Sequence, residues 1–155
     1  MTSVTKEYVD QQCMVGSGNA AWVPCVLAGG SNFDDFRAID FIENRGANDL
    51  YLRLMLPLPT NKGGKKLYVS GVRVGLVDAD DDDYLNMIKV IGLKYSTSDA
   101  LYQNYGDWKS QQKVEYTFTG KNASGYDQVA VTLHIVATSY RDVKISGILL
   151  KCYYG

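Results

Sequence analysis

The chain has 155 residues, with 16 basic and 17 acidic side chains and a formal net charge of −1. This length is typical of one compact domain that buries roughly two thirds of its unfolded surface. A nearly neutral chain has no long-range field to attract phosphate backbones or anionic lipid, so we expect no nucleic-acid partner. No apolar run approaches the length of a bilayer span, and we expect no membrane insertion.

The N-terminal segment is polar, with scattered apolar residues, and ends in Gly-Ser-Gly. We expect an arm over residues 1–18 and a single domain over residues 19–155. The arm lacks the apolar stretch of a secretory signal, and the chain begins with an initiator-like Met1. We therefore expect a protein made without a signal peptide, which acts in a virion, in an extracellular assembly or in the cytoplasm, and a mature product whose signal was removed is the alternative.

Three cysteines, Cys13, Cys25 and Cys152, match no zinc, haem or redox spacing. They cannot all pair within one chain. We expect reduced thiols and no cofactor, and a bridge between Cys13 and Cys25 is the alternative.

The first half of the chain contains three segments with strand character. AAWVPCVLA, residues 20–28, is the first, and Pro24 restricts it to an edge or a bulge. FRAIDFIE, residues 36–43, is apolar on both sides. LYLRLMLPL, residues 50–58, alternates with a period of two and predicts a buried face, formed by Leu50, Leu52, Leu54 and Leu56.

Residues 65–95 contain two long runs, LYVSGVRVGLV and YLNMIKVIGLKY, on either side of the acidic turn at residues 78–83. Aromatic and β-branched residues fill the runs, and the break is rich in turn-forming aspartate. The pattern predicts a β-hairpin of long strands.

Residues 96–110 are polar, contain three aromatic residues and show no sustained period. We expect a structured loop there, with a short helix at residues 99–102. Three further strands are predicted at residues 113–119, 128–138 and 143–154, separated by turn-forming residues.

About eight strands without a long helix predict an all-β fold, an antiparallel two-sheet β-sandwich with jelly-roll topology preferred. An immunoglobulin-like sandwich is the alternative, although its Cys, Trp, Cys arrangement is absent. The succession of strands resembles the generic jelly rolls of viral coat proteins and carbohydrate-binding modules. It matches the specific motif of neither.

The sequence shows no constellation typical of catalysis. His134 is the only histidine, it lies within a strand, and we expect it to bond a neighbour. GxSxG does not occur, and the adjacent acids Asp34 and Asp35 are more simply a turn or a cap than an acid/base pair. We expect a protein that is not an enzyme.

The acidic turn offers four carboxylates that could bind calcium weakly, namely Asp78, Asp80, Asp82 and Asp83. It is not an EF-hand, because Asp83 stands where that loop needs glycine and Lys89 where it needs glutamate. A solvated tip whose charge discourages edge-to-edge pairing is the alternative.

Tyr102, Tyr105 and Trp108 occur at a spacing of three in the predicted loop. Such side chains can form a platform for a glycan or a contact with another protein. The alternative is that they fold back over the open end of the core.

Two segments are apolar on both faces, and an isolated sandwich should be polar outside. This pattern predicts an assembly interface formed by Ile39, Phe41, Ile148 and Leu150. We therefore expect a homo-oligomer that acts as a non-enzymatic structural subunit, such as a viral coat, capsid-decoration, tail or filament component. The alternative is a carbohydrate-binding β-sandwich module that uses the aromatic loop.

Overall fold

The computed structural model describes residues 20–30, 33–36, 41–44, 48–139 and 142–155, and throughout these residues the regular structure is strand. The expected arm lies outside the described residues. The described part contains no helix long and apolar enough to cross a membrane. The strands are β1 (Ala21–Pro24), β2 (Val26–Gly30), β3 (Phe33–Phe36), β4 (Phe41–Asn44), β5 (Asn48–Met55), β6 (Asn61–Lys62), β7 (Lys65–Asp78), β8 (Tyr84–Lys94), β9 (Thr97–Trp108), β10 (Gln112–Asn122), β11 (Gln128–Ala137) and β12 (Lys144–Tyr154).

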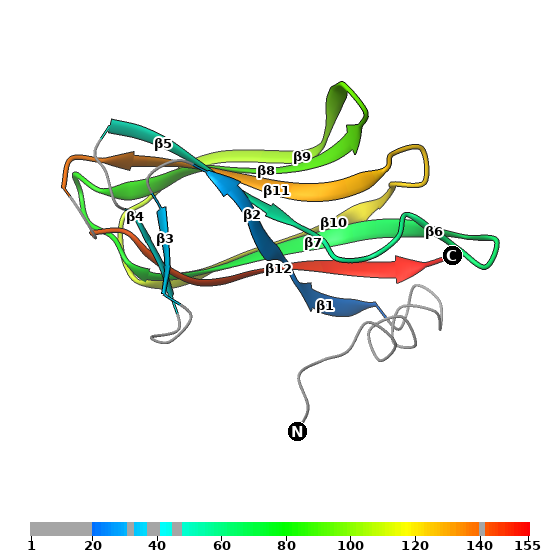
Figure 1. Cartoon of the computed structure of the whole chain (residues 1–155). Helices are drawn as coiled ribbons and strands as arrows, with labels where there is room; N and C mark the ends of the chain where they lie inside the picture. The colour runs from blue at the N-terminus through cyan, green and yellow to red at the C-terminus, as the bar shows by residue number, and fades with distance from the viewer. Residues whose placement is uncertain (1–19, 31–32, 37–40, 45–47, 140–141) are drawn as a thin grey trace.

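The strands form two antiparallel sheets that stack face to face (Figure 1). The seven-stranded sheet has the order β10-β7-β12-β4-β3, with β1 beside β12 and β6 beside β7. The five-stranded sheet has the order β2-β5-β11-β8-β9. In the long strands, β1-β12-β7-β10 face β5-β11-β8-β9, so the first and last strands are neighbours. Apart from the β8–β9 hairpin, successive long strands lie in opposite sheets. This order is that of a jelly roll, and it confirms the predicted fold class.

Period-two alternation in the long strands supplies the core between the sheets. Leu50, Leu52, Leu54 and Leu56 are all at most 4 % exposed, as predicted. Most of the remaining core comes from β7, β8, β11 and β12. It includes Val72, Val74, Ile88, Val90, Val131, Leu133, Ile148 and Leu150. Each buried side chain of this size stabilises the fold by roughly 1.5–3 kcal/mol relative to an exposed one.

The first predicted strand divides at Pro24 and joins both sheets. β1 pairs with β12 in one sheet, and β2 pairs with β5 at the edge of the other. Between them the Cys25 amide donates to the Ile148 carbonyl oxygen at 2.8 Å. Proline lacks an amide proton, so it is tolerated here, where the strand pairs on one side and then turns away.

The predicted hairpin around the acidic turn is wrong. The two long strands form where expected, but β7 pairs with β10 and β12, whereas β8 pairs with β11 and β9. The turn therefore crosses from one sheet to the other. Stacked sheets lie about 10 Å apart, a distance that five residues can span.

The predicted loop and short helix at residues 96–110 are also wrong. The segment is strand β9, which forms the edge of the five-stranded sheet and pairs with β8 from Lys94 and Thr97 to Leu85 and Trp108. An edge strand keeps much of its length in water, so its sequence can stay polar and lose the clean apolar period on which the prediction relied.

The outward placement of Ile148 and Leu150 is wrong. They are 1 % and 0 % exposed, and they pair with Val74 and Val72 across the centre of the seven-stranded sheet. β12 looked apolar on both faces because it is a central strand, whose outward face is itself half-buried. Ile39 lies outside the described residues, and of Phe41 only the backbone is described, paired with Phe36.

We predict that Leu150→Ala lowers the free energy of unfolding by about 2–5 kcal/mol, because it opens a cavity between the sheets. The neighbouring Leu149→Ala is the matched control, since Leu149 is half-buried on the outward face of the same strand. It should cost about 1 kcal/mol. Chemical denaturation of both variants measures the difference, and equal losses would contradict the assigned faces.

Candidate functional site

The outer face of the five-stranded sheet carries the side chains that alternate with the core leucines and valines. On β5 these are Tyr51 and Arg53, and on β11 they are Thr132 and His134. Tyr51 is 57 % exposed and is one of few large apolar side chains open to solvent in the described structure. Because one face of each strand is buried, the polar and aromatic side chains lie on the opposite, outer face.

The strand register aligns these side chains into two rows that cross four strands. The aromatic row consists of Tyr51, His134, Met87 and Tyr105, each paired with the next. The cationic row is paired in the same way two residues along each strand, and consists of Arg53, Thr132, Lys89 and Gln103. Neighbouring strands lie about 4.8 Å apart, so each row is about 14 Å long, and the two rows are about 6.7 Å apart.

A chain of contacts holds one half of the aromatic row in place. The ring of Tyr51 lies against that of His134, with centroids 4.7 Å apart and planes inclined by 31°. Nδ1 of His134 is 2.9 Å from Oδ1 of Asn86. Nδ2 of Asn86 in turn donates to a carboxylate oxygen of Asp107 at 3.2 Å.

These contacts assign the proton on His134. A carboxylate only accepts, so the amide nitrogen of Asn86 must face Asp107 and its oxygen must face His134. The hydrogen bond therefore requires that Nδ1 of His134 donates. Because Nδ1 is engaged with an amide oxygen, it does not hold a carboxylate as a catalytic triad histidine does.

The other half of the aromatic row is anchored on β9. Nε2 of Gln103 donates to the hydroxyl of Tyr105 and lies 3.6 Å from the sulfur of Met87. Tyr105 itself is 68 % exposed. The tip of the β8–β9 hairpin, at Lys94 and Thr97, rises away from the sandwich (Figure 1).

The three aromatic residues predicted as one platform do not share a surface. Tyr102 and Trp108 point inward and pack against the core at the open side between β9 and β10. The ring of Tyr102 stacks on Phe118 at 4.3 Å between centroids, and Trp108 meets Tyr116 at 6.3 Å. For these two residues the alternative, that they close the core, is confirmed. Only Tyr105 faces solvent, as part of the aromatic row.

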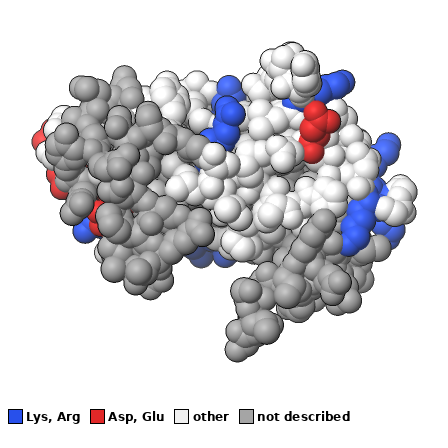
Figure 2. All heavy atoms as spheres, viewed as in Figure 1, with Lys and Arg blue, Asp and Glu red and all other residues white. Residues whose placement is uncertain are grey.

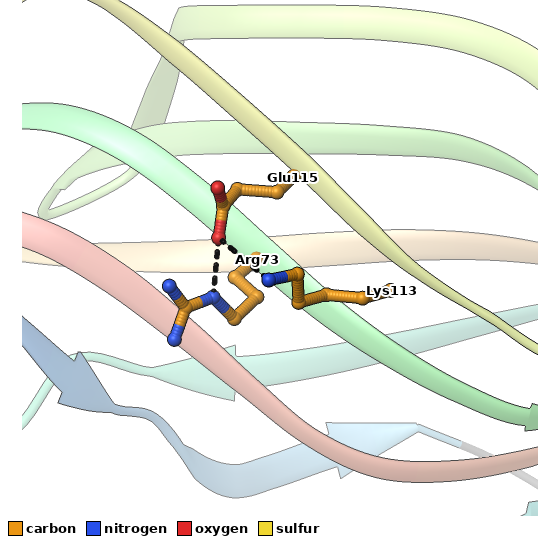
Figure 3. A network of polar contacts seen from close by, with 3 residues as sticks. All are labelled: Arg73, Lys113 and Glu115. Atoms are coloured by element: carbon orange, nitrogen blue, oxygen red, sulfur yellow. Dashed lines mark hydrogen bonds and ion pairs between the residues drawn. The ribbon is translucent and has the colours of Figure 1, made fainter.

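The outer face of the seven-stranded sheet differs, because it contains a network of paired charges. Nε of Arg73 donates to Glu115 at 2.6 Å, and Nζ of Lys113 lies 3.8 Å from the same carboxylate (Figure 3). The hydrogen bond from Arg73 holds the pKa of the Glu115 carboxyl below its ordinary value. The Arg73 guanidinium also lies 4.2 Å from the ring centroid of Trp22. Pairs this exposed contribute little stability.

The acidic turn is held by two of its aspartates. Oδ1 of Asp80 accepts from the amides of Asp82 and Asp83 at 2.9 and 2.8 Å. The carboxylate of Asp83 is only 2 % exposed and accepts from the Thr138 amide and from the Ser139 amide at 3.0 Å. Asp83 thereby ties the crossing between the sheets to the end of β11.

The carboxylates that could share a cation are not the predicted four. Asp80 and Asp83 come together with Asp142, with ligand oxygens all within 4.8 Å of one another. Asp78 and Asp82 are not part of this group. Backbone amides already satisfy Asp80 and Asp83, so the cluster does not require a metal ion to hold it, and weak calcium binding stays a prediction.

Cys25 carries a free thiol. Burial raises its pKa to about 12, so it stays protonated and unreactive at neutral pH. Cys13 lies outside the described residues, so the alternative bridge from Cys13 to Cys25 stays untested.

Tyr51, His134 and Asn86 were not predicted as members of one surface. The strands of Tyr51 and His134 were predicted, and period two places both residues opposite the core face. What the sequence lacks is the pairing of β5 with β11 and of β11 with β8, which brings residues more than 30 positions apart into one row.

A comparison with solved structures finds a similar fold in a carbohydrate-binding module. No family description matches the sequence, and no curated protein matches it. Among solved structures, the family 32 carbohydrate-binding module of C. perfringens NanJ in complex with galactose has a TM-score of 0.55 and 9 % identity, and the match covers 88 % of this chain and 99 % of that one. A chitosan-binding module from a chitosanase/glucanase of Paenibacillus sp. IK-5 has a TM-score of 0.43 and 15 % identity, over 84 % of this chain and 93 % of that one.

We predict that Asp83→Ala lowers the free energy of unfolding by about 2–4 kcal/mol, because it leaves two backbone amides without their acceptor. Asp81→Ala is the control, since Asp81 is exposed in the same turn, and it should change stability by less than about 0.5 kcal/mol. Urea denaturation of the two variants checks this, and an equally small loss for both would show that the Asp83 bonds do not matter.

We predict that micromolar free calcium leaves the melting temperature unchanged. Calcium at about ten times its dissociation constant would stabilise the fold by roughly 1.4 kcal/mol, which thermal denaturation detects. We expect such a shift only at millimolar concentrations. A shift of several degrees at micromolar calcium, abolished by Asp80→Asn and Asp142→Asn, would establish the tight site that we do not expect.

Proposed function

We propose that this protein is a non-enzymatic carbohydrate-binding module whose sugar-binding surface is the aromatic row on the outer face of the five-stranded sheet. The observation that carries the proposal is the pair of exposed tyrosines, Tyr51 and Tyr105, held on rigid strands beside hydrogen-bonding side chains. The similarity to a galactose-binding module in overall fold supports the class of function.

The chemistry of the row suits a sugar. The apolar C–H face of a pyranose stacks on an exposed aromatic ring, while its hydroxyl groups need donors and acceptors at the ring's edge. Around Tyr51 and Tyr105 the surface offers the amides of Asn86 and Gln103 and the carboxylate of Asp107. The internal hydrogen bonds fix these groups before a ligand arrives, which lowers the entropic cost of binding.

Self-assembly as a structural subunit loses half of the observation on which it rested. Ile148 and Leu150 are core residues and cannot contact a second molecule. On the side of the molecule that Figure 2 shows, the charged groups of the described residues are few and scattered. A native mass measurement separates the alternatives, since a monomer that binds glycans supports the module and a large oligomer inert to glycans supports assembly.

We predict that Tyr51→Ala and Tyr105→Ala each weaken glycan binding by about two- to tenfold, because each removes a stacking surface worth roughly 0.5–1.5 kcal/mol. Calorimetric titration against a panel of neutral and acidic oligosaccharides measures the effect. Both tyrosines are exposed, so the melting temperature should change little.

Tyr95→Ala is the matched control for this prediction. Tyr95 is a fully exposed tyrosine at the tip of the β8–β9 hairpin, eight residues from Met87 along β8. That separation is about 26 Å, well outside the aromatic row. A wild-type protein that binds no glycan of the panel, or an equal loss in Tyr95→Ala, would overturn the proposed function.

A further inference from the structure

The cationic row beside the aromatic row contains two basic side chains without a carboxylate partner. Arg53 is exposed and Lys89 is half-buried. Among the described residues, Glu115 pairs with Arg73 and with Lys113, all three on the opposite sheet. Arg53 and Lys89 have no such carboxylate partner among these residues and remain available to an anionic ligand.

One described carboxylate on this face, that of Asp107, lies at the β9 edge, where Asn86 already donates to it. Arg53 stands on β5, at the far end of its row, and Lys89 stands two strands from it. Among the described residues, neither cation forms an ion pair with a carboxylate.

The strand lattice sets the distance between these charges and the stacking surfaces. Arg53 is two residues from Tyr51 along β5, and Lys89 is two residues from Met87 along β8. Both separations are about 6.7 Å between Cα atoms. A sugar stacked on the aromatic row would therefore lie within reach of a long basic side chain at its edge.

The dimensions also bear on the size of the ligand. Tyr51 and Tyr105 stand three strand intervals apart, about 14 Å, which is wider than one pyranose ring. The two tyrosines must then stack on different sugar residues. A ligand that uses the whole row is an oligosaccharide that lies across the strands.

We propose that the preferred ligand is an acidic oligosaccharide of uronic acid residues, whose rings stack on the aromatic row and whose carboxylates pair with Arg53 and Lys89. A guanidinium matches the planar carboxylate with two parallel hydrogen bonds, and a lysine ammonium adds a point charge. This inference rests on the proposed function and specifies its ligand.

The test compares binding of uronate trisaccharides with binding of their neutral methyl esters by calorimetry. The panel consists of galacturonate, glucuronate and mannuronate trimers and a trisaccharide of neutral sugars that carries a sulfate group. We expect the wild-type protein to bind at least one uronate trimer roughly tenfold more tightly than its ester, because the ester keeps the stacking and loses the charge. Higher salt should reduce this preference.

The double variant Arg53→Gln, Lys89→Gln should lose the preference and bind the ester as the wild-type protein does. Lys113→Gln, on the other sheet, is the control and should keep it. Equal affinity of the wild-type protein for the uronate and its ester would overturn the proposal of an acidic ligand. The proposed function would stay intact, provided that Tyr51→Ala still weakens binding. Tighter binding of the sulfated trisaccharide than of every uronate would also overturn it, and the absence of binding to any glycan would overturn both.

Discussion

The burial of leucine, valine and isoleucine side chains between the two sheets fixes where the alternating side chains of the described strands point. Because side chains alternate strictly along a strand, a shift of one residue would move Leu50, Leu52 and Leu54 to solvent and bring Tyr51 and Arg53 inside. That exchange would bury a charge and lose several large apolar contacts, so the register is strongly specified. The position of the outer-face residues is thus a consequence of the core.

The two outer faces show that a sheet surface can be stabilised in more than one way. On the seven-stranded sheet, Arg73 pairs with Glu115 and lies over the ring of Trp22. On the five-stranded sheet, the polar contacts run among His134, Asn86 and Asp107 and leave the tyrosine rings open. This second arrangement is rigid and yet unsatisfied toward solvent, which is the condition of a binding surface.

Much of the fold could be predicted from the sequence, because period-two alternation survives in strands with one buried face. The segments of Leu50 and of Leu133 were therefore located correctly. The edge strand that contains Tyr105 was missed, since partial exposure removes the apolar period, and Ile148 was assigned to the wrong face, since a central strand is apolar on both sides. The candidate site could not be predicted as a unit, because Tyr51, His134 and Asn86 meet only through pairings between distant strands.

The central claim is that a glycan binds across the outer face of the five-stranded sheet. The most direct measurement is a map of backbone amide chemical shifts during titration with the tightest-binding trisaccharide of the panel. The account predicts that the largest changes fall on β5, β11, β8 and β9, around Tyr51, Lys89 and Tyr105. Changes confined to β7, β10 and β12, or to the loops at the ends of the sandwich, would contradict it.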